Sequence, residues 1–370
     1  GQPDFHSVLA RVAEYHRSHQ AALAEQGKAL REALARIDAG SAENQTWPGL
    51  APLSIAREAL AAGFDRQYGG WGHAPKFPQV LAIRHLLHRW RASAPGDEPD
   101  LQALFMATFT LTRIAEGGLQ DAARGGFYRY CHDAAWQQPQ REKALVDNAQ
   151  LLEVFAEAAV LTGEVRFREV AHRSADALLR DFLRPTGGFR VTAPQAGATA
   201  VNDDTPLRIG PNALAVRALT AAGRWLGRDD LDAAAARTLE LLRSLEPVTL
   251  AEHAGLLDAI LQRQLPGADE GLLTWAANLG QTLLDRFEDV GRGGFFATAE
   301  DSIPLFHRAR EFADSGTASG NALALQGLLR LDGLHPIPGA RGAMERTLQA
   351  ASLRLVEQPL AHLGLLDALA

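Results

Sequence analysis

Apolar residues recur along most of the chain with the 3.6-residue spacing of an α-helix, and stretches with the alternating pattern of a β-strand are scarce. The helical stretches are rich in Ala, Leu and Arg, and they end at clusters of Gly and Pro, which stop helices. The pattern therefore predicts an all-α protein, with helices over 6–38 (with a break), 52–62, 79–92, 99–116, 144–161, 165–182, 211–225, 228–244, 248–264, 268–287, 320–331, 340–356 and 359–369.

Long loops between these helices carry a repeated phrase, in which two glycines are followed by an aromatic residue. Successive copies are 56, 62 and 106 residues apart, and the last interval is close to two repeats. A period of this length indicates supersecondary units that are each too small to bury their own apolar face. Two glycines permit a tight turn with positive φ, and the aromatic side chain can pack the turn onto the helices. The copies are Gly69-Gly70-Trp71, Gly125-Gly126-Phe127, Gly187-Gly188-Phe189 and Gly293-Gly294-Phe295.

A second repeat opens alternate helices, where one polar residue is followed by small or apolar residues. The interval is 109 residues both from Asn212 to Asn321 and from His253 to His362. The polar residues are Asn148, Asn212, His253, Asn321 and His362, with Gln79 as the candidate for a sixth. Together the two repeats define six helical hairpins, which predict an (α/α)6 toroid with an N-terminal helical extension.

The two helices of a hairpin differ in their patterning. The segment 165–182 has one apolar stripe, as expected for an outer helix, whereas 144–161 and 211–225 are apolar nearly all round, as expected for inner helices. The N-terminal ends of the inner helices, with their free N–H groups, would converge on a central cavity. We expect a helical connector over 1–46 and the toroid domain over 47–370.

Composition and charge restrict the function classes. The net charge is −7 without a basic block, so nucleic acid is not an expected partner, and no apolar run approaches the ~18 residues of a membrane-spanning helix. The single cysteine, Cys131, excludes an internal disulfide and a multi-cysteine zinc site. No phosphate-binding loop or nucleophile turn is present, and we expect neither a metal nor a cofactor. The 34 Arg against 3 Lys are typical of a GC-rich bacterial genome, and the lack of a signal-peptide pattern indicates a cytoplasmic protein.

The loop 69–78 is the most distinctive stretch of the sequence. Lys76 is one of only three lysines, and its ammonium is a candidate contact for an anion or carbonyl of a ligand. Trp71 and His73 of the same loop are further candidate ligand contacts. Alternatively, Lys76 pairs with a neighbouring carboxylate and holds the loop in place.

The next long loop combines aromatic, basic and acidic side chains. A sugar site needs stacking surfaces and carboxylates that exchange protons, so Glu142 and Asp147 are a candidate catalytic pair. Alternatively, Asp147 belongs to the first helical turn and Glu142 with Lys143 fixes the loop. The candidate ligand contacts of this region are Arg129, Trp136, Lys143 and Asn148.

The starts of the other inner helices supply the remaining candidates. His253 and His362 occupy equivalent places and are candidate proton carriers near neutral pH, although a helix histidine is more often a packed or capping residue. Polar residues before or at helix starts either cap the helix or bind a polyhydroxylated ligand. The candidates of this kind are Asp204, Asn212, Asp314 and Asn321.

Several of these motifs resemble the YyaL-like, spermatogenesis-associated, thioredoxin-linked proteins. The resemblance covers about 50–332; it is most specific at 69–78 and continues at 125–136, 139–149, 203–212 and 314–321. It implies an (α/α)6 domain similar to six-hairpin glycosidases and N-acylglucosamine 2-epimerases. It also implies a thioredoxin-like domain as a partner in the full-length protein, which is absent from this chain, and 1–38 resemble the connector that follows that domain.

These observations predict a cavity that binds a carbohydrate-like polar small molecule. The first hypothesis is an enzyme of the sugar epimerase, isomerase or glycosidase type, in which Glu142, Asp147 and His253 or His362 move protons. The second is a non-catalytic binding or scaffold module, because Gln140-Arg141 stand where the family usually has His-Phe. A helical-toroid cyclase or prenyltransferase is a weaker third, since its acidic and zinc-binding motifs are missing.

Overall fold

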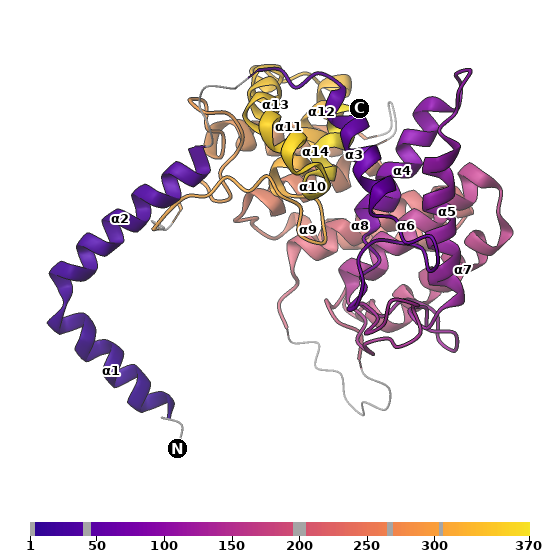
Figure 1. The fold of residues 1–370 in the computed structure, drawn as a ribbon, viewed down its shortest axis with the longest axis horizontal. Helices are drawn as coiled ribbons and strands as arrows, with labels where there is room; N and C mark the ends of the chain where they lie inside the picture. The colour runs from indigo at the N-terminus through magenta and orange to yellow at the C-terminus, as the bar shows by residue number, and fades with distance from the viewer. Residues whose placement is uncertain (1–3, 40–45, 195–204, 265–268, 303–305) are drawn as a thin grey trace.

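A computed structural model of the chain describes residues 4–39, 46–194, 205–264, 269–302 and 306–370. Within these ranges the regular structure is helical, and β-pairing is limited to isolated bridges between loops. Twelve of the described helices alternate between an inner and an outer layer, which confirms the predicted (α/α)6 toroid (Figure 1). Among the described helices, none combines the length and the apolar character that a membrane-spanning segment requires.

The inner layer is a ring. Each inner helix packs against the next one along the chain, and the last packs against the first, so the ring is closed. The inner helices are α4 (Val80–Ser93), α6 (Leu145–Thr162), α8 (Ile209–Leu226), α10 (Leu250–Arg263), α12 (Gly320–Leu334) and α14 (Leu363–Leu369).

The outer layer covers this ring with one helix per hairpin. The first outer helix packs against the last two helices of the chain, which completes the sixth hairpin from opposite ends of the sequence. The outer helices are α3 (Ala51–Ala62), α5 (Leu101–Glu116), α7 (Val165–Ala177), α9 (Asp229–Arg243), α11 (Glu270–Arg286) and α13 (Ala340–Glu357). Two short turns adjoin the layers, the π-helical η2 (Leu178–Phe182) after α7 and the 3₁₀-helical η3 (Pro359–Ala361) before α14.

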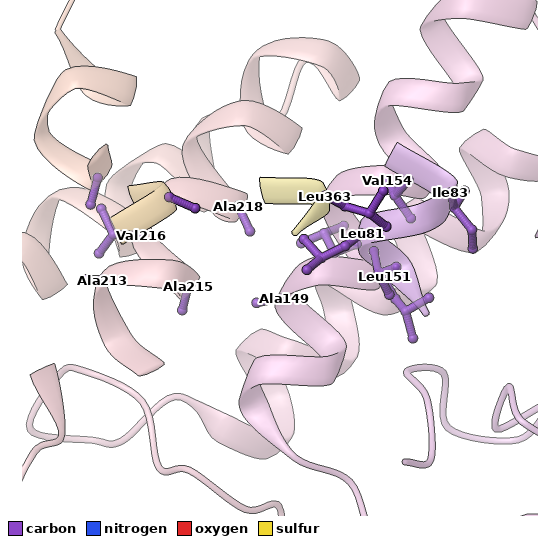
Figure 2. Packing of buried hydrophobic residues seen from close by; sticks show 14 of the residues in the cluster. Leu81, Ile83, Ala149, Leu151, Val154, Ala213, Ala215, Val216, Ala218 and Leu363 are labelled. Carbon is purple, nitrogen blue, oxygen red and sulfur yellow. The ribbon is translucent and has the colours of Figure 1, made fainter. Parts of the chain in front are cut away.

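Burial follows the predicted patterning. On α6 every residue from Asn148 to Ala159 is buried, whereas α7 buries only one side, including Phe167, Val170 and Ala171. Figure 2 shows part of the core, where α6 and α8 contribute many alanines. Because alanine side chains are small, they allow the inner helices to approach closely around the ring.

The N-terminal helices α1 (Phe5–Ser18) and α2 (Gln20–Ala39) extend away from the toroid (Figure 1). The predicted break in this region lies at His19, the C-cap of α1. No residue of α1 is buried. α2 touches the toroid where the guanidinium of Arg31 lies 5.3 Å from the centre of the Phe306 ring. The division into a connector and a toroid domain at residues 46 and 47 stays a prediction.

Candidate functional site

The predicted ligand-binding asparagines clamp the Gly-Gly-aromatic loops to the inner helices. Oδ1 of Asn148 accepts a hydrogen bond from the Phe127 N–H at 2.7 Å, and its Nδ2 donates to the Phe127 carbonyl at 2.9 Å. Both glycines of all four loops have positive φ, as expected for the tight turn. The same two hydrogen bonds join Asn212 to Phe189 and Asn321 to Phe295.

The two loop lysines make equivalent contacts inside their own loops. Nζ of Lys76 donates to Asp65 at 2.7 Å, and Nζ of Lys143 donates to Asp121 at 2.8 Å. Burial alone would raise the pKa of Asp121, but Lys143, with the Arg124 N–H and the Tyr128 hydroxyl, outweighs burial and lowers that pKa to about 2. Both lysines are buried, and both hold a loop in place, as the alternative interpretation of Lys76 anticipated.

The predicted aromatic residues and the two helix-start histidines also have hydrogen-bond partners in the scaffold. The indole N–H groups of Trp71 and Trp136 donate to the carbonyls of Leu60 and Tyr68, and both rings are buried. His73 is exposed in its loop. Nδ1 of His253 lies 2.9 Å from the Thr249 carbonyl, and Nδ1 of His362 lies 2.8 Å from the Gln358 carbonyl. Burial lowers the pKa of both histidines, which favours the neutral rings.

Three of the predicted residues meet at the start of α6. Nε of Arg129 lies 3.5 Å from Asp147, and its Nη1 lies 3.9 Å from Glu142. Burial raises the pKa of Asp147 to about 6, and the charge of Glu142 adds to this effect although Arg129 opposes it. Asp147 is therefore a carboxyl group that can both give and take a proton near neutral pH.

Asp314 is a second carboxyl group of this kind, in the loop before α12. Its Oδ1 accepts from the Ser319 N–H at 2.9 Å, and its Oδ2 accepts from the Gly364 N–H at 2.8 Å. Burial nevertheless raises the pKa of Asp314 to about 6, and the nearby charge of Asp367 contributes. The remaining candidate, Asp204, lies outside the described residues.

A cavity of about 240 Å³ lies inside the ring, near the N-terminal ends of the inner helices. The wall is mainly apolar, and its charged members are Arg84, Arg217 and Asp258. None of the residues predicted to bind or transform a ligand is part of the wall itself. The wall comprises Leu81, Arg84, Val146, Gln150, Gly210, Pro211, Leu214, Arg217, Ala251, Gly255, Asp258, Thr317, Ala318 and Leu323.

Two charged clusters extend from the cavity wall into the ring. In the first, Arg217 of α8 lies 2.8 Å from Glu153 of α6 and 3.0 Å from Asp258 of α10. Arg330 of α12 approaches Asp258 at 2.8 Å. Arg217, Glu153 and Asp258 are buried, so these opposite charges offset one another inside the ring.

The second cluster surrounds Asp367 of α14. Oδ1 of Asp367 lies 2.6 Å from Nδ1 of His85, and Oδ2 lies 3.5 Å from Nδ1 of His88 and 3.7 Å from Nε of Arg84. Burial alone would lower the pKa of His88, but Asp367 and Glu157 outweigh it and raise that pKa to about 9. His88 is therefore protonated at neutral pH. Among the described residues, no group of three or more His, Cys, Asp and Glu side chains could hold a metal ion.

Sequence reasoning missed these clusters, although the repeat contains a signal for them. A polar or charged residue follows the polar helix start at an interval of five in all six inner helices. Since five residues are about one and a half turns, this position reaches deeper into the ring than the helix start. The six residues are Arg84, Glu153, Arg217, Asp258, Gln326 and Asp367.

Comparison with curated proteins identifies relatives over half of the chain. Spermatogenesis-associated protein 20 of Rattus norvegicus is 32% identical over 187 residues, which are 50% of this chain and 24% of the rat protein. The Homo sapiens protein of the same name gives the same identity over the same number of residues. The match therefore spans about a quarter of the length of these relatives. No family model matches the chain.

Solved structures match over most of the chain. Cellobiose 2-epimerase from Spirochaeta thermophila has a TM-score of 0.63 at 17% identity, covering 92% of this chain and 89% of that chain. A D-mannose isomerase has a TM-score of 0.60 at 11% identity, covering 82% and 85%. A family 76 glycoside hydrolase from a bovine Bacteroides thetaiotaomicron strain has a TM-score of 0.56 at 9% identity, covering 86% and 77%.

These comparisons confirm the resemblance found in the sequence motifs. At such low identity the solved structures establish the fold and nothing about the reaction. This chain is homologous over half of its length to spermatogenesis-associated protein 20, a YyaL-like protein, and it has the six-hairpin fold of sugar epimerases, isomerases and glycoside hydrolases.

Proposed function

We propose that the central cavity binds a carbohydrate-like small molecule and that the protein is an enzyme of the sugar epimerase, isomerase or glycosidase type. The observation that carries this proposal is the cavity itself, which lies at the helix starts of a ring fold shared with sugar-processing enzymes. Its volume of about 240 Å³ is below the ~300–1,000 Å³ of sites for drug-sized ligands, and it suits one sugar ring. Apolar walls with a few polar groups suit the C–H faces and hydroxyl groups of such a ring.

Asp147 and Asp314 are the proton-transfer groups in this proposal. Asp147 follows Val146 of the cavity wall, and Asp314 belongs to the loop that supplies Thr317 and Ala318 to the wall. Nε2 of Gln150 donates to the Gly316 carbonyl at 3.1 Å, so this hydrogen bond ties the start of α6 to the Asp314 loop.

Two carboxyl groups with a pKa of about 6 suit a reaction that removes a proton from one side of a sugar carbon and returns one to the other. Glu142 assists by raising the pKa of Asp147. His253 and His362 have a structural role in this proposal, through their hydrogen bonds to backbone carbonyls at the helix starts.

The alternative is a binding or scaffold module without turnover. The observation in its favour is that Arg217, Asp258 and Arg330 are already paired with protein charges, as in a structural ion network. A module of this kind would bind a sugar without changing it.

Incubation with a panel of aldoses, ketoses and disaccharides in D₂O, followed by ¹H NMR, tests both possibilities. An epimerase or isomerase exchanges a carbon-bound proton next to the carbonyl for deuterium, and a glycosidase releases new reducing ends. We expect Asp147→Asn and Asp314→Asn to lower the rate at least about 100-fold. The control is Asp301→Asn, which removes an exposed partner of Arg286 and should leave the rate unchanged.

Thermal melting establishes that each variant is folded. Wild-type rates in both folded carboxyl variants would remove Asp147 and Asp314 from the mechanism. Binding of a sugar without exchange or hydrolysis would favour the alternative module, and the absence of binding across the panel would refute the proposed function.

A further inference from the structure

Arg84 has a longer ion-pair contact than Arg217, the other arginine of the cavity wall. Only 7% of the residue is exposed, and it lines the cavity together with Leu81 of the same helix. The Nε atoms of Arg84 and Arg217 are both buried without a hydrogen-bond partner among the described residues, but Nε of Arg217 lies only 3.0 Å from Asp258. A guanidinium has five N–H donors in a planar fork, and a buried donor without an acceptor is costly.

The carboxylate that pairs with Arg84, that of Asp367, also contacts other groups. Asp367 lies 3.7 Å from Nε of Arg84, beyond hydrogen-bonding distance, while it contacts His85 at 2.6 Å. The protonated His88 shares the same carboxylate. In contrast, Arg217 on the same wall has two carboxylates within 3.0 Å. Arg84 is therefore the wall arginine with the weaker ion pairing, because its contact with Asp367 is long and that carboxylate is shared with His85 and His88.

We propose that the ligand of the cavity is an acidic sugar and that Arg84 binds its carboxylate. This inference rests on the proposed function, and it narrows the substrate class from sugars in general to sugars with one carboxylate, such as hexuronates. A carboxylate presents two oxygens with the spacing of a guanidinium fork, so it satisfies the donors of Arg84 and its charge together.

The charge of the site favours a carboxylate over a phosphate. The charge of Arg217 is shared between Glu153 and Asp258, so it offers little to a second negative charge on a ligand. A phosphate monoester carries between one and two negative charges at neutral pH, whereas a sugar carboxylate carries one. The apolar part of the wall, with Val146 and Leu214, would then face the rest of the sugar.

Titration calorimetry with a matched set of ligands tests the inference. The ligands are D-glucose, D-glucuronate and D-glucose 6-phosphate, which share a ring and differ in charge. We expect wild-type protein to bind glucuronate at least tenfold more tightly than glucose and more tightly than the phosphate. Arg84→Gln should abolish the preference for glucuronate, and Arg84→Lys, which keeps the charge without the fork, should retain part of it.

The control is Arg91→Gln on the same helix. Arg91 is exposed and lies 3.7 Å from Glu157, so this variant should keep the wild-type preference. Thermal melting establishes folding, and the wild-type comparison of glucose with glucuronate tests the inference even if an Arg84 variant does not fold.

Each contrary result has a distinct meaning. Equal or tighter binding of glucose would overturn the acid preference and leave the proposed sugar function standing. Tightest binding of the phosphate would overturn the assignment to a carboxylate, and an undiminished preference in folded Arg84→Gln would overturn the role of Arg84. If no sugar binds at all, the proposed function fails together with the inference.

Discussion

Asp367 and His85 are 282 residues apart in the sequence, and their side chains meet at 2.6 Å where α14 closes the inner ring against α4. The same carboxylate also faces His88 and Arg84. The Asp367 carboxylate therefore faces two cations from the first inner helix, Arg84 and the protonated His88.

Replacing this carboxylate should weaken the closed ring. We expect Asp367→Asn to lower the free energy of unfolding by about 3 kcal/mol, because it leaves Arg84 and the protonated His88 without their shared carboxylate. Asp301→Asn removes an exposed ion pair and should cost less than about 1 kcal/mol. Chemical denaturation of both variants checks the difference, and equal stabilities would show that the Asp367 cluster does not hold the ring together.

The stability of the protein should depend on pH through His88. Asp367 and Glu157 raise its pKa from 6.5 to about 9, so its contribution is complete below pH 6.5 and is lost as the pH rises through 9. Because the imidazole of His88 is partly exposed to solvent, we expect this contribution to be about 1–2 kcal/mol. Denaturation at pH 6 and pH 9.5 should show the loss in wild-type protein and a smaller one in His88→Gln. An equal loss in both would exclude His88 as its source.

The three asparagine clamps, at Asn148, Asn212 and Asn321, should each contribute to stability. Asn212→Ala removes the two hydrogen bonds to Phe189 and leaves buried backbone groups unpaired, so we expect a loss of about 2–4 kcal/mol. Asn278 is exposed on α11, and Asn278→Ala should change stability by less than about 0.5 kcal/mol. Thermal and chemical unfolding measure both, and a folded Asn212→Ala with wild-type stability would contradict the structural role of the clamp.

The glycine turns allow a matched test of close packing. Gly294 has a φ of 82°, and a Cβ placed there would lie 2.6 Å from the Phe312 ring. Gly163 has a similar φ of 72°, but a Cβ there would meet nothing within 4 Å. Gly163→Ala should therefore cost about 1–2 kcal/mol for the backbone alone, and Gly294→Ala should cost about 1–3 kcal/mol more. Equal costs for the two substitutions would mean that the Gly294 turn has room to adjust.

The fold could be predicted because its repeats have local chemical causes. Positive φ explains the glycine pairs, and the clamp explains why an asparagine such as Asn148 recurs at the start of an inner helix. These requirements recur at four and three of the six hairpins, at intervals of one or two repeats, so their spacing indicates the length of the repeat. The segment 165–182 was predicted as one helix, and it contains α7 and the π-helical η2, since periodicity does not distinguish these forms.

The candidate site could be predicted only in part. Arg129, Glu142 and Asp147 do come together, because they are close in sequence around one helix start. The Asp367 cluster depends on contacts between α4 and α14, and no local pattern specifies which side of an inner helix faces the ring centre. The polar starts of the helices suggested ligand contacts, but residues one and a half turns further on form the charged interior.

The most direct test of the central claim is a crystal structure of the protein with a bound sugar. We predict density for one sugar ring inside the cavity, in contact with Arg84 and Gln150 and within reach of Asp147 or Asp314. A ring bound elsewhere on the protein, with the central cavity empty, would contradict the claim that this cavity is the functional site.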